Sequence, residues 1–219
     1  MMLRPQRVVA ALALGFVAFT VVVALGWLAA WDVRVLHWAY VAWSGWAYLP
    51  VSLGSALGSV EVTSLVVLLV GVWLWRQRRL RSLWALLAFV VAGFLEVAFK
   101  ETMHHPSPPS WAYHGTDFTL VSALVTHTNL EANSYPSGHV LRAAVAFGLA
   151  AVVLWQARPS LTTRRATVLG LGALWLLVGF CRIYQNAHWF TDVIGAYLLG
   201  ALVVTLAAWW VERNWADPV

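Results

Sequence analysis

Four residues near the middle of the chain, Pro136-Ser137-Gly138-His139, lead into an apolar run that continues to about residue 156. A helix that starts with Ser-Gly presents unpaired backbone N–H groups and the positive end of its dipole, which suits an anion such as phosphate. Gly138 has no side chain, so a ligand can approach the backbone closely. The tetrapeptide therefore predicts that Ser137 and Gly138 bind phosphate at the N-terminus of a helix.

Two histidines and three charged residues fit chemistry at such a bound phosphate. His188 precedes Asp192 by four residues, so the carboxylate can fix the tautomer of the imidazole and raise its basicity. His139 is then a candidate to protonate the leaving oxygen. Lys100 and Arg182 can add charge-assisted contacts to the phosphate oxygens. This combination suits chemistry at a bound phosphate, with His188 as the candidate nucleophile and His139 as the candidate general acid.

The composition shows where these residues must lie. Of the 219 residues, 61% are hydrophobic and only 11% are charged, whereas a soluble domain has about a quarter charged residues. This is the composition of a polytopic membrane protein. The net charge of +5 would suggest nucleic acid only in a soluble protein, so we expect membrane lipids and no nucleic acid as partners. The single cysteine, Cys181, excludes an internal disulfide and a Cys-based zinc site.

Apolar runs predict an all-α fold with six transmembrane helices in one bundle and one domain, residues 1–219. The helices are expected near 8–30, 60–75, 82–103, 138–156, 166–184 and 189–211. The first run is too long for the apolar core of a secretory signal and favours a retained helix. Residues 32–58 are aromatic and broken by glycine and proline, which is typical of an interfacial segment. Residues 104–135 form the one long polar loop.

The basic residues predict the orientation. Arg4 and Arg7 precede the first predicted helix, and Arg76 to Arg81 lie between the second and third. Arg158 to Arg165 lie between the fourth and fifth, and Arg213 follows the sixth. With six helices all these groups fall on one side, which is therefore cytoplasmic together with both termini. All seven histidines map to the other side, so we expect the active site to be extracytoplasmic in the cell membrane.

Taken one at a time, these residues have simpler explanations. Lys100 and Arg182 are also typical of cations that reach from a helix end to the interface. The i, i+4 spacing of Glu96 and Lys100 favours a structural ion pair. His188 and Asp192 could serve only to hydrogen-bond each other. The arrival of all of them on one side of the membrane favours a common site.

The motifs together resemble those of the type 2 phosphatidic acid phosphatase (PAP2) superfamily. The family patterns are Lys-x6-Arg-Pro, Pro-Ser-Gly-His and Ser-Arg-x5-His-x3-Asp. The second pattern matches completely at residues 136–139. The third matches at Arg182, His188 and Asp192, with Cys181 in the place of serine. The motifs cover residues 100–192, and the predicted six helices fit the rest of the chain.

The resemblance implies a metal-free and cofactor-free phosphatase that forms a phosphohistidine intermediate. His188 would attack phosphorus, Asp192 would orient it, and His139 would protonate the leaving group. The phosphate would be bound by Lys100, Ser137, Gly138 and Arg182. It also implies a lipid phosphate substrate at the outer membrane face. Undecaprenyl diphosphate is our first expectation, and phosphatidylglycerol phosphate and phosphatidic acid are the alternatives.

The first motif departs from the family. Ser107 stands seven residues after Lys100, where the family has arginine, and His105 stands where many members have a second arginine. Serine can donate a hydrogen bond but cannot neutralise charge. We expect Arg142, three residues after His139, or His105 to substitute partly for the missing cation. A weakened enzyme is the alternative.

Other functions use the same residues. A phosphotransferase would pass the phosphoryl group to an acceptor other than water, and a lipid-phosphate binder or transporter would have kept the site without catalysis. A zinc hydrolase built on His104, His105 and His114 is disfavoured, because these histidines lack a helical ligand spacing and have only Asp117 nearby as a carboxylate.

Overall fold

The computed structural model describes residues 5–115, 133–157 and 160–215, and this part of the chain is built from helices. The α-helices are α1 (Pro5–Ala24), α2 (Ala29–Ala42), α3 (Tyr48–Ala56), α4 (Val60–Arg76), α5 (Leu87–Thr102), α7 (Gly138–Ala157), α8 (Leu161–Tyr184) and α9 (Phe190–Asn214). Three 3-10 turns accompany them: η1 (Gly45–Ala47), η2 (Leu80–Leu86) and η3 (Ser110–Ala112). The predicted all-α membrane fold is confirmed.

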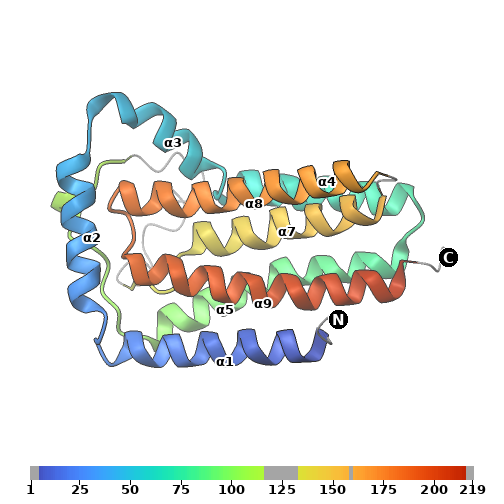
Figure 1. Ribbon diagram of the computed structural model, residues 1–219, viewed down its shortest axis with the longest axis horizontal. Helices are drawn as coiled ribbons and strands as arrows, with labels where there is room; N and C mark the ends of the chain where they lie inside the picture. The colour runs from blue at the N-terminus through green and yellow to red at the C-terminus, as the bar shows by residue number, and fades with distance from the viewer. Residues whose placement is uncertain (1–4, 116–132, 158–159, 216–219) are drawn as a thin grey trace.

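Helix α7 lies at the centre of the bundle, in contact with α4, α5, α8 and α9 (Figure 1). Its residues are apolar or small on nearly every face, and such a helix is stable only when other helices surround it. Most of it is buried, from Gly138 to Val153. The N-terminus of the most buried helix therefore brings the Pro-Ser-Gly-His sequence to the middle of one end of the bundle.

Within residues 5–115, 133–157 and 160–215, five helices are long and apolar enough to cross a membrane, and the number is six if one bent pair of helices forms a single span. The pair joins Gly45–Ala56 to Val60–Arg76 at an angle of 41°. The predicted second helix, 60–75, is thus the longer arm of this bent pair. In the third span, Leu80–Thr102, η2 continues directly into α5. The remaining predicted helices are found with small shifts at their ends.

The first predicted helix, 8–30, was too long. Helix α1 ends at Ala24, and Gly26 has a φ of 71°, a left-handed conformation that turns the chain at low cost only in glycine. Helix α2 starts at Ala29 and crosses the end of the bundle nearly at right angles to the spans (Figure 1). The position of α2 is that expected of an interfacial segment. Helix α3, in contrast, turns back and packs along α8.

Hydrogen bonds to backbone carbonyls hold the described parts of the polar loop to each other and to the end of the bundle. Ser134 N donates to His105 O at 2.9 Å, and the indole Nε1 of Trp189 donates to Pro106 O at 2.7 Å. Farther along, His114 N donates to Gln185 O at 3.0 Å. His127 and Asp117 lie outside the described residues. The loop thereby holds His105 against the start of α9.

Candidate active site

The three sequence motifs meet at the end of the bundle that α2 crosses. Lys100 is in the last turn of α5, His139 is in the first turn of α7, Arg182 is in the last turn of α8, and His188 and Asp192 flank the start of α9. The backbone of Ser137 donates to Asp192 O at 3.1 Å, which joins the second motif directly to the third. Arg182, His188 and Lys100 are all close enough to His139 to interact with it electrostatically.

Asp192 is fully buried, and each of its carboxylate oxygens lies 3.2 Å from Nδ1 of a histidine. Its Oδ2 accepts the backbone N–H of Trp189 at 2.9 Å, which caps α9, and lies 3.2 Å from Nδ1 of His188. An ionised carboxylate only accepts hydrogen bonds, so Nδ1 of His188 carries the proton. The lone pair of Nε2 is then available for attack.

Burial lowers the pKa of His188, and the positive charge of Arg182 lowers it further, while the hydrogen bond to Asp192 opposes them. The net pKa lies below its ordinary value, because the desolvation of an imidazolium outweighs one hydrogen bond here. His188 is therefore neutral near pH 7, which is the form that can act as a nucleophile.

His105 occupies the other oxygen of the same carboxylate. Its Nδ1 lies 3.2 Å from Oδ1 of Asp192 and 3.3 Å from the hydroxyl of Ser134. Burial lowers the pKa of His105, but the hydrogen bond to Asp192 and the charges of Asp192 and Asp32 outweigh burial and raise it above 6.5. His105 is thus a titratable cation beside the His188–Asp192 pair.

Stability should report this titration. A histidine with a raised pKa contributes most below pH 6.5, and its contribution is lost as the pH rises through the folded-state pKa. We expect His105→Gln to lower the thermal unfolding midpoint in detergent at about pH 6 but to change it much less at about pH 9. His188 titrates in both proteins, so their difference isolates His105. A difference that stays constant across this range would contradict the pairing with Asp192.

Asp32, on α2, fixes the first turn of α9 from outside. It is buried, and its two oxygens accept the backbone N–H of Thr191 at 2.9 Å and the Thr191 hydroxyl at 2.8 Å. Burial raises the pKa of Asp32 above its ordinary value, although both Thr191 hydrogen bonds lower it. Because Thr191 immediately precedes Asp192, α2 positions the carboxylate that holds His188.

Removing this support should have a measurable cost. Asp32→Ala leaves two buried donors of Thr191 without an acceptor, at about 1–3 kcal/mol each, so we expect a clear fall in the unfolding midpoint. Thr191→Val removes only the hydroxyl and should lower the midpoint less. Unfolding curves in detergent measure both changes. An Asp32→Ala protein that melts with the wild type would refute this role.

Glu96 links two of the cations. Its Oε1 lies 3.1 Å from Nζ of Lys100, and its Oε2 lies 2.6 Å from Nη1 of Arg142. The predicted ion pair with Lys100 is present, and the second partner, Arg142, adds the cation of α7. Arg142 therefore lies within the cluster of site residues, as its proposed compensating role requires, whereas Ser107 is half-buried in the polar loop.

The carboxylate of Glu96 also lies against the start of α7. A Cβ placed on Gly138 would clash with Oε1 of Glu96, so no larger residue fits there unless Glu96 moves. Gly138 thus permits close approach, as predicted, but in this structure the approaching anion is a side chain of the protein. Two donors beside it, the Ser137 hydroxyl and Nε of Arg142, are buried and have no hydrogen-bond partner among the described residues.

Arg182 is buried, and its Nη1 donates to the hydroxyl of Ser55 at 3.1 Å. The alternative in which Arg182 snorkels to the interface is therefore wrong. The turn after α3 also contacts the site, because a Cβ on Gly58 would lie 2.7 Å from the carbonyl oxygen of His139. The aromatic segment and α3 thus form one wall of the site.

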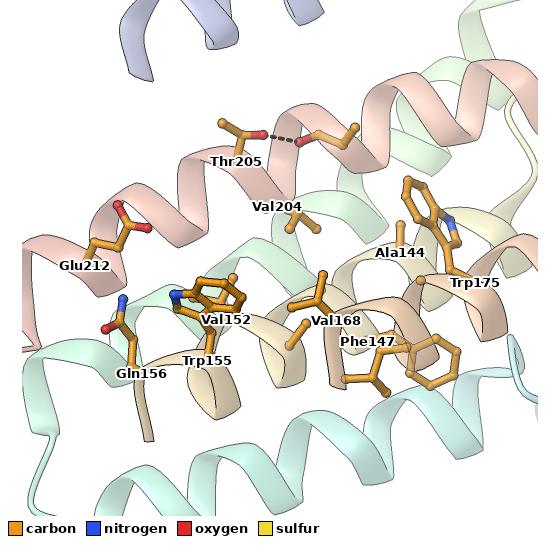
Figure 2. Close-up of a pocket in the computed structure, with 15 residues that line it drawn as sticks. Ala144, Phe147, Val152, Trp155, Gln156, Val168, Trp175, Val204, Thr205 and Glu212 are labelled. Carbon is orange, nitrogen blue, oxygen red and sulfur yellow. Dashed lines mark hydrogen bonds between the residues drawn. The ribbon is translucent and has the colours of Figure 1, made fainter. Parts of the chain in front are cut away.

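An apolar cavity of about 460 Å³ lies deeper in the bundle, between α7, α8 and α9 (Figure 2). Ala144, Val152 and Val204 line it, and Gln156 and Glu212 stand at the end farthest from the motifs. None of the candidate site residues lines this cavity. It is distinct from the site.

The histidines proposed as a zinc cluster do not converge. His105 faces Asp192, while the ring of His114 stacks on Trp43 with centroids 4.8 Å apart. Across residues 5–115, 133–157 and 160–215, no group of three or more His, Cys, Asp or Glu side chains is arranged to hold a metal ion.

Sequence analysis missed Asp32, Ser55 and the Glu96–Arg142 pair. A signal for Asp32 did exist, since it is an isolated acid in an aromatic, apolar segment, where a charge needs a partner. Ser55 and the second partner of Glu96 had no comparable signal, because both contacts join separate helices.

Known proteins resemble the chain in sequence and in fold. The chain is 35% identical over 81 residues to phosphatidylglycerophosphatase B of Bacillus subtilis (strain 168). The match covers 36% of this chain and 40% of the relative, which is well under two thirds of its length. The crystal structure of a transmembrane PAP2-type phosphatidylglycerolphosphate phosphatase from Bacillus subtilis superposes with a TM-score of 0.77. It covers 94% of this chain and 96% of that one at 24% identity, which shows a common fold.

The family assignment rests on a longer match. The family model of the PAP2 superfamily matches residues 81–216, from η2 to the end of α9, and so includes all three motifs. The chain belongs to the PAP2 superfamily.

Proposed function

We propose that the chain is a metal-independent phosphatase that removes phosphate from a membrane lipid through a phosphohistidine intermediate. The observation that carries this proposal is the His188–Asp192 pair, in which the fully buried carboxylate lies 3.2 Å from Nδ1 of His188. A transporter or a non-catalytic binder would need cations for the phosphate but would not need a neutral imidazole fixed in one tautomer.

Phosphatidylglycerol phosphate is the substrate that we propose first. The partial match to phosphatidylglycerophosphatase B supports it, and our earlier expectation of undecaprenyl diphosphate has no specific support from the comparisons. Undecaprenyl diphosphate is the second candidate. Both are lipid phosphates, and the same residues would act on either.

In the first step Nε2 of His188 attacks phosphorus, a P–N bond forms, and the bond from phosphorus to the lipid oxygen breaks. His139 donates a proton to that oxygen, so the lipid leaves as an alcohol or, from a diphosphate, as a monophosphate. Lys100, Arg182, Ser137 and the first-turn N–H groups of α7 hold the phosphate oxygens.

In the second step water attacks the phosphohistidine. His139, now neutral, takes a proton from the water, the P–N bond breaks, and inorganic phosphate leaves with His188 restored. Asp192 keeps Nδ1 of His188 as the protonated nitrogen throughout, so the same Nε2 is the leaving group here and the nucleophile in the next cycle.

We also propose that the site faces the extracytoplasmic side. The end of the bundle opposite to the site is where α1 begins (Figure 1). The same end carries the basic residues Arg76 to Arg81, Arg164, Arg165 and Arg213. The positive-inside rule supports a cytoplasmic location for that end.

The test is phosphate release by the purified protein from a panel of phosphatidylglycerol phosphate, phosphatidic acid and undecaprenyl diphosphate, with and without a chelator. Release that persists with chelator and is greatest for phosphatidylglycerol phosphate is the expected result. Loss of activity with chelator would reject the metal-independent mechanism. Transfer of phosphate to an added alcohol in preference to water would favour the phosphotransferase. Binding without release from any lipid would favour the transporter.

A further inference from the structure

Glu96 places a negative charge where the proposed substrate would place another. Its two oxygens contact Lys100 and Arg142, and the carboxylate lies against Gly138, the first residue of α7. The first N–H groups of a helix have no acceptor within it, so this end of α7 attracts anions. Glu96 thus has the same kinds of contacts that the proposed function assigns to a phosphate.

The carboxylate uses only part of the binding capacity around it. The hydroxyl of Ser137 and Nε of Arg142 are buried beside it without a hydrogen-bond partner among the described residues. Buried donors normally have acceptors. A carboxylate has two oxygens, whereas the three free oxygens of a phosphate monoester could accept from more of these donors.

Charge also makes the two anions exclusive. Glu96 is buried, as is Ser137, so a bound phosphate would be separated from the carboxylate by little water. Two like charges brought together in such a place repel strongly, and the carboxylate must either withdraw or weaken phosphate binding. Both outcomes lower the affinity for phosphate.

We propose that Glu96 is an intramolecular counter-anion that competes with phosphate for Lys100 and Arg142. This inference rests on the proposed function, because it takes the site to be one that binds a phosphate group. When the site is empty, Glu96 keeps two partly buried cations paired. After hydrolysis it returns to them and displaces inorganic phosphate, which shortens the lifetime of the product complex. A lipid phosphate has its tail to add to its affinity, whereas free phosphate does not.

The alternative role for Glu96 predicts an effect of opposite sign. If the carboxylate only orients Lys100 and Arg142 for the substrate, removing it disorders the cations and weakens phosphate binding. If it competes, removing it strengthens binding. Measuring the binding of inorganic phosphate to the purified full-length chain in detergent, by calorimetry or by phosphorus NMR, separates the two without any need for turnover.

The variants are Glu96→Gln and Glu96→Ala, with Glu101→Gln as the matched control. Glu101 is the next acid on α5 and is exposed. We expect both Glu96 variants to bind phosphate about tenfold more tightly than the wild type, and the control to bind it unchanged. Equal or weaker binding by the Glu96 variants would overturn the proposal, even in a chain that hydrolyses lipid phosphates. Tighter binding in a chain without turnover would uphold it while rejecting the proposed phosphatase.

A second measurement uses the wild type alone and covers the case in which the variants fail to fold. A structure of the chain with orthovanadate, a tetrahedral mimic of phosphate, should show the Glu96 carboxylate moved away from Gly138. Vanadate bound beside a carboxylate that keeps both its ion pairs would contradict the competition.

Discussion

Replacing His188 by glutamine is expected to reduce phosphate release by at least about a thousandfold, because the variant has no imidazole nitrogen to attack phosphorus. Glutamine keeps a polar side chain of moderate size next to Asp192, so the loss should lie in kcat rather than in folding. Asp192→Asn should cost about 10²–10⁴-fold, since it removes the negative charge and replaces one acceptor oxygen by an N–H donor, so that the proton is no longer fixed on Nδ1 of His188.

The matched control is His37→Gln. His37 is exposed on α2, the helix that crosses the same end of the bundle, and lies outside the set of site residues. Its variant should retain full activity. Rates of phosphate release are measured beside unfolding midpoints in detergent. A His188→Gln protein that keeps more than about a tenth of the activity would rule out His188 as the nucleophile.

Arg142→Gln is expected to raise KM for the lipid phosphate and to lower kcat/KM by about 30- to 150-fold, which corresponds to about 2–3 kcal/mol. The reason is the incomplete first motif. Ser107 stands where the family has arginine, and Arg142 lies near the other cations of the site. Its Nη1 is 2.6 Å from Oε2 of Glu96, the carboxylate that we propose to compete with phosphate.

Two further variants sharpen this prediction. Arg165→Gln, an exposed arginine at the opposite end of α8, should leave the kinetics unchanged. Ser107→Arg, added to Arg142→Gln, restores the cation of the family motif and should recover at least about tenfold of the lost efficiency. Unchanged phosphate affinity in Arg142→Gln would show that Arg142 does not compensate for the missing arginine.

The sequence allowed good prediction wherever local patterns decide the structure. Helices α7, α8 and α9 follow long apolar runs, and their ends coincide with the motifs, so the meeting of Lys100, His139, Arg182 and His188 could be inferred. His188 and Asp192 are only four residues apart and flank the start of α9, so their contact is local in the sequence.

Long-range contacts escaped prediction. Arg142 and Glu96 are 46 positions apart, and Thr191 and Asp32 are 159 positions apart, so no spacing rule connects them. The end of α1 at Ala24 depends on one glycine with positive φ, which hydropathy does not register. The orientation of α3 depends on its packing against α8, which becomes visible only when the helices are assembled.

The hydrogen bonds from Asp32 to Thr191 connect a helix that crosses the bundle to the carboxylate that fixes His188. If α2 lies among the lipid headgroups, its depth relative to the bundle depends on the thickness of the bilayer. We therefore expect turnover to vary between vesicles of short-chain and long-chain lipids, and this variation to shrink in Asp32→Asn. Equal sensitivity in the two proteins would mean that the membrane does not act on the site through α2.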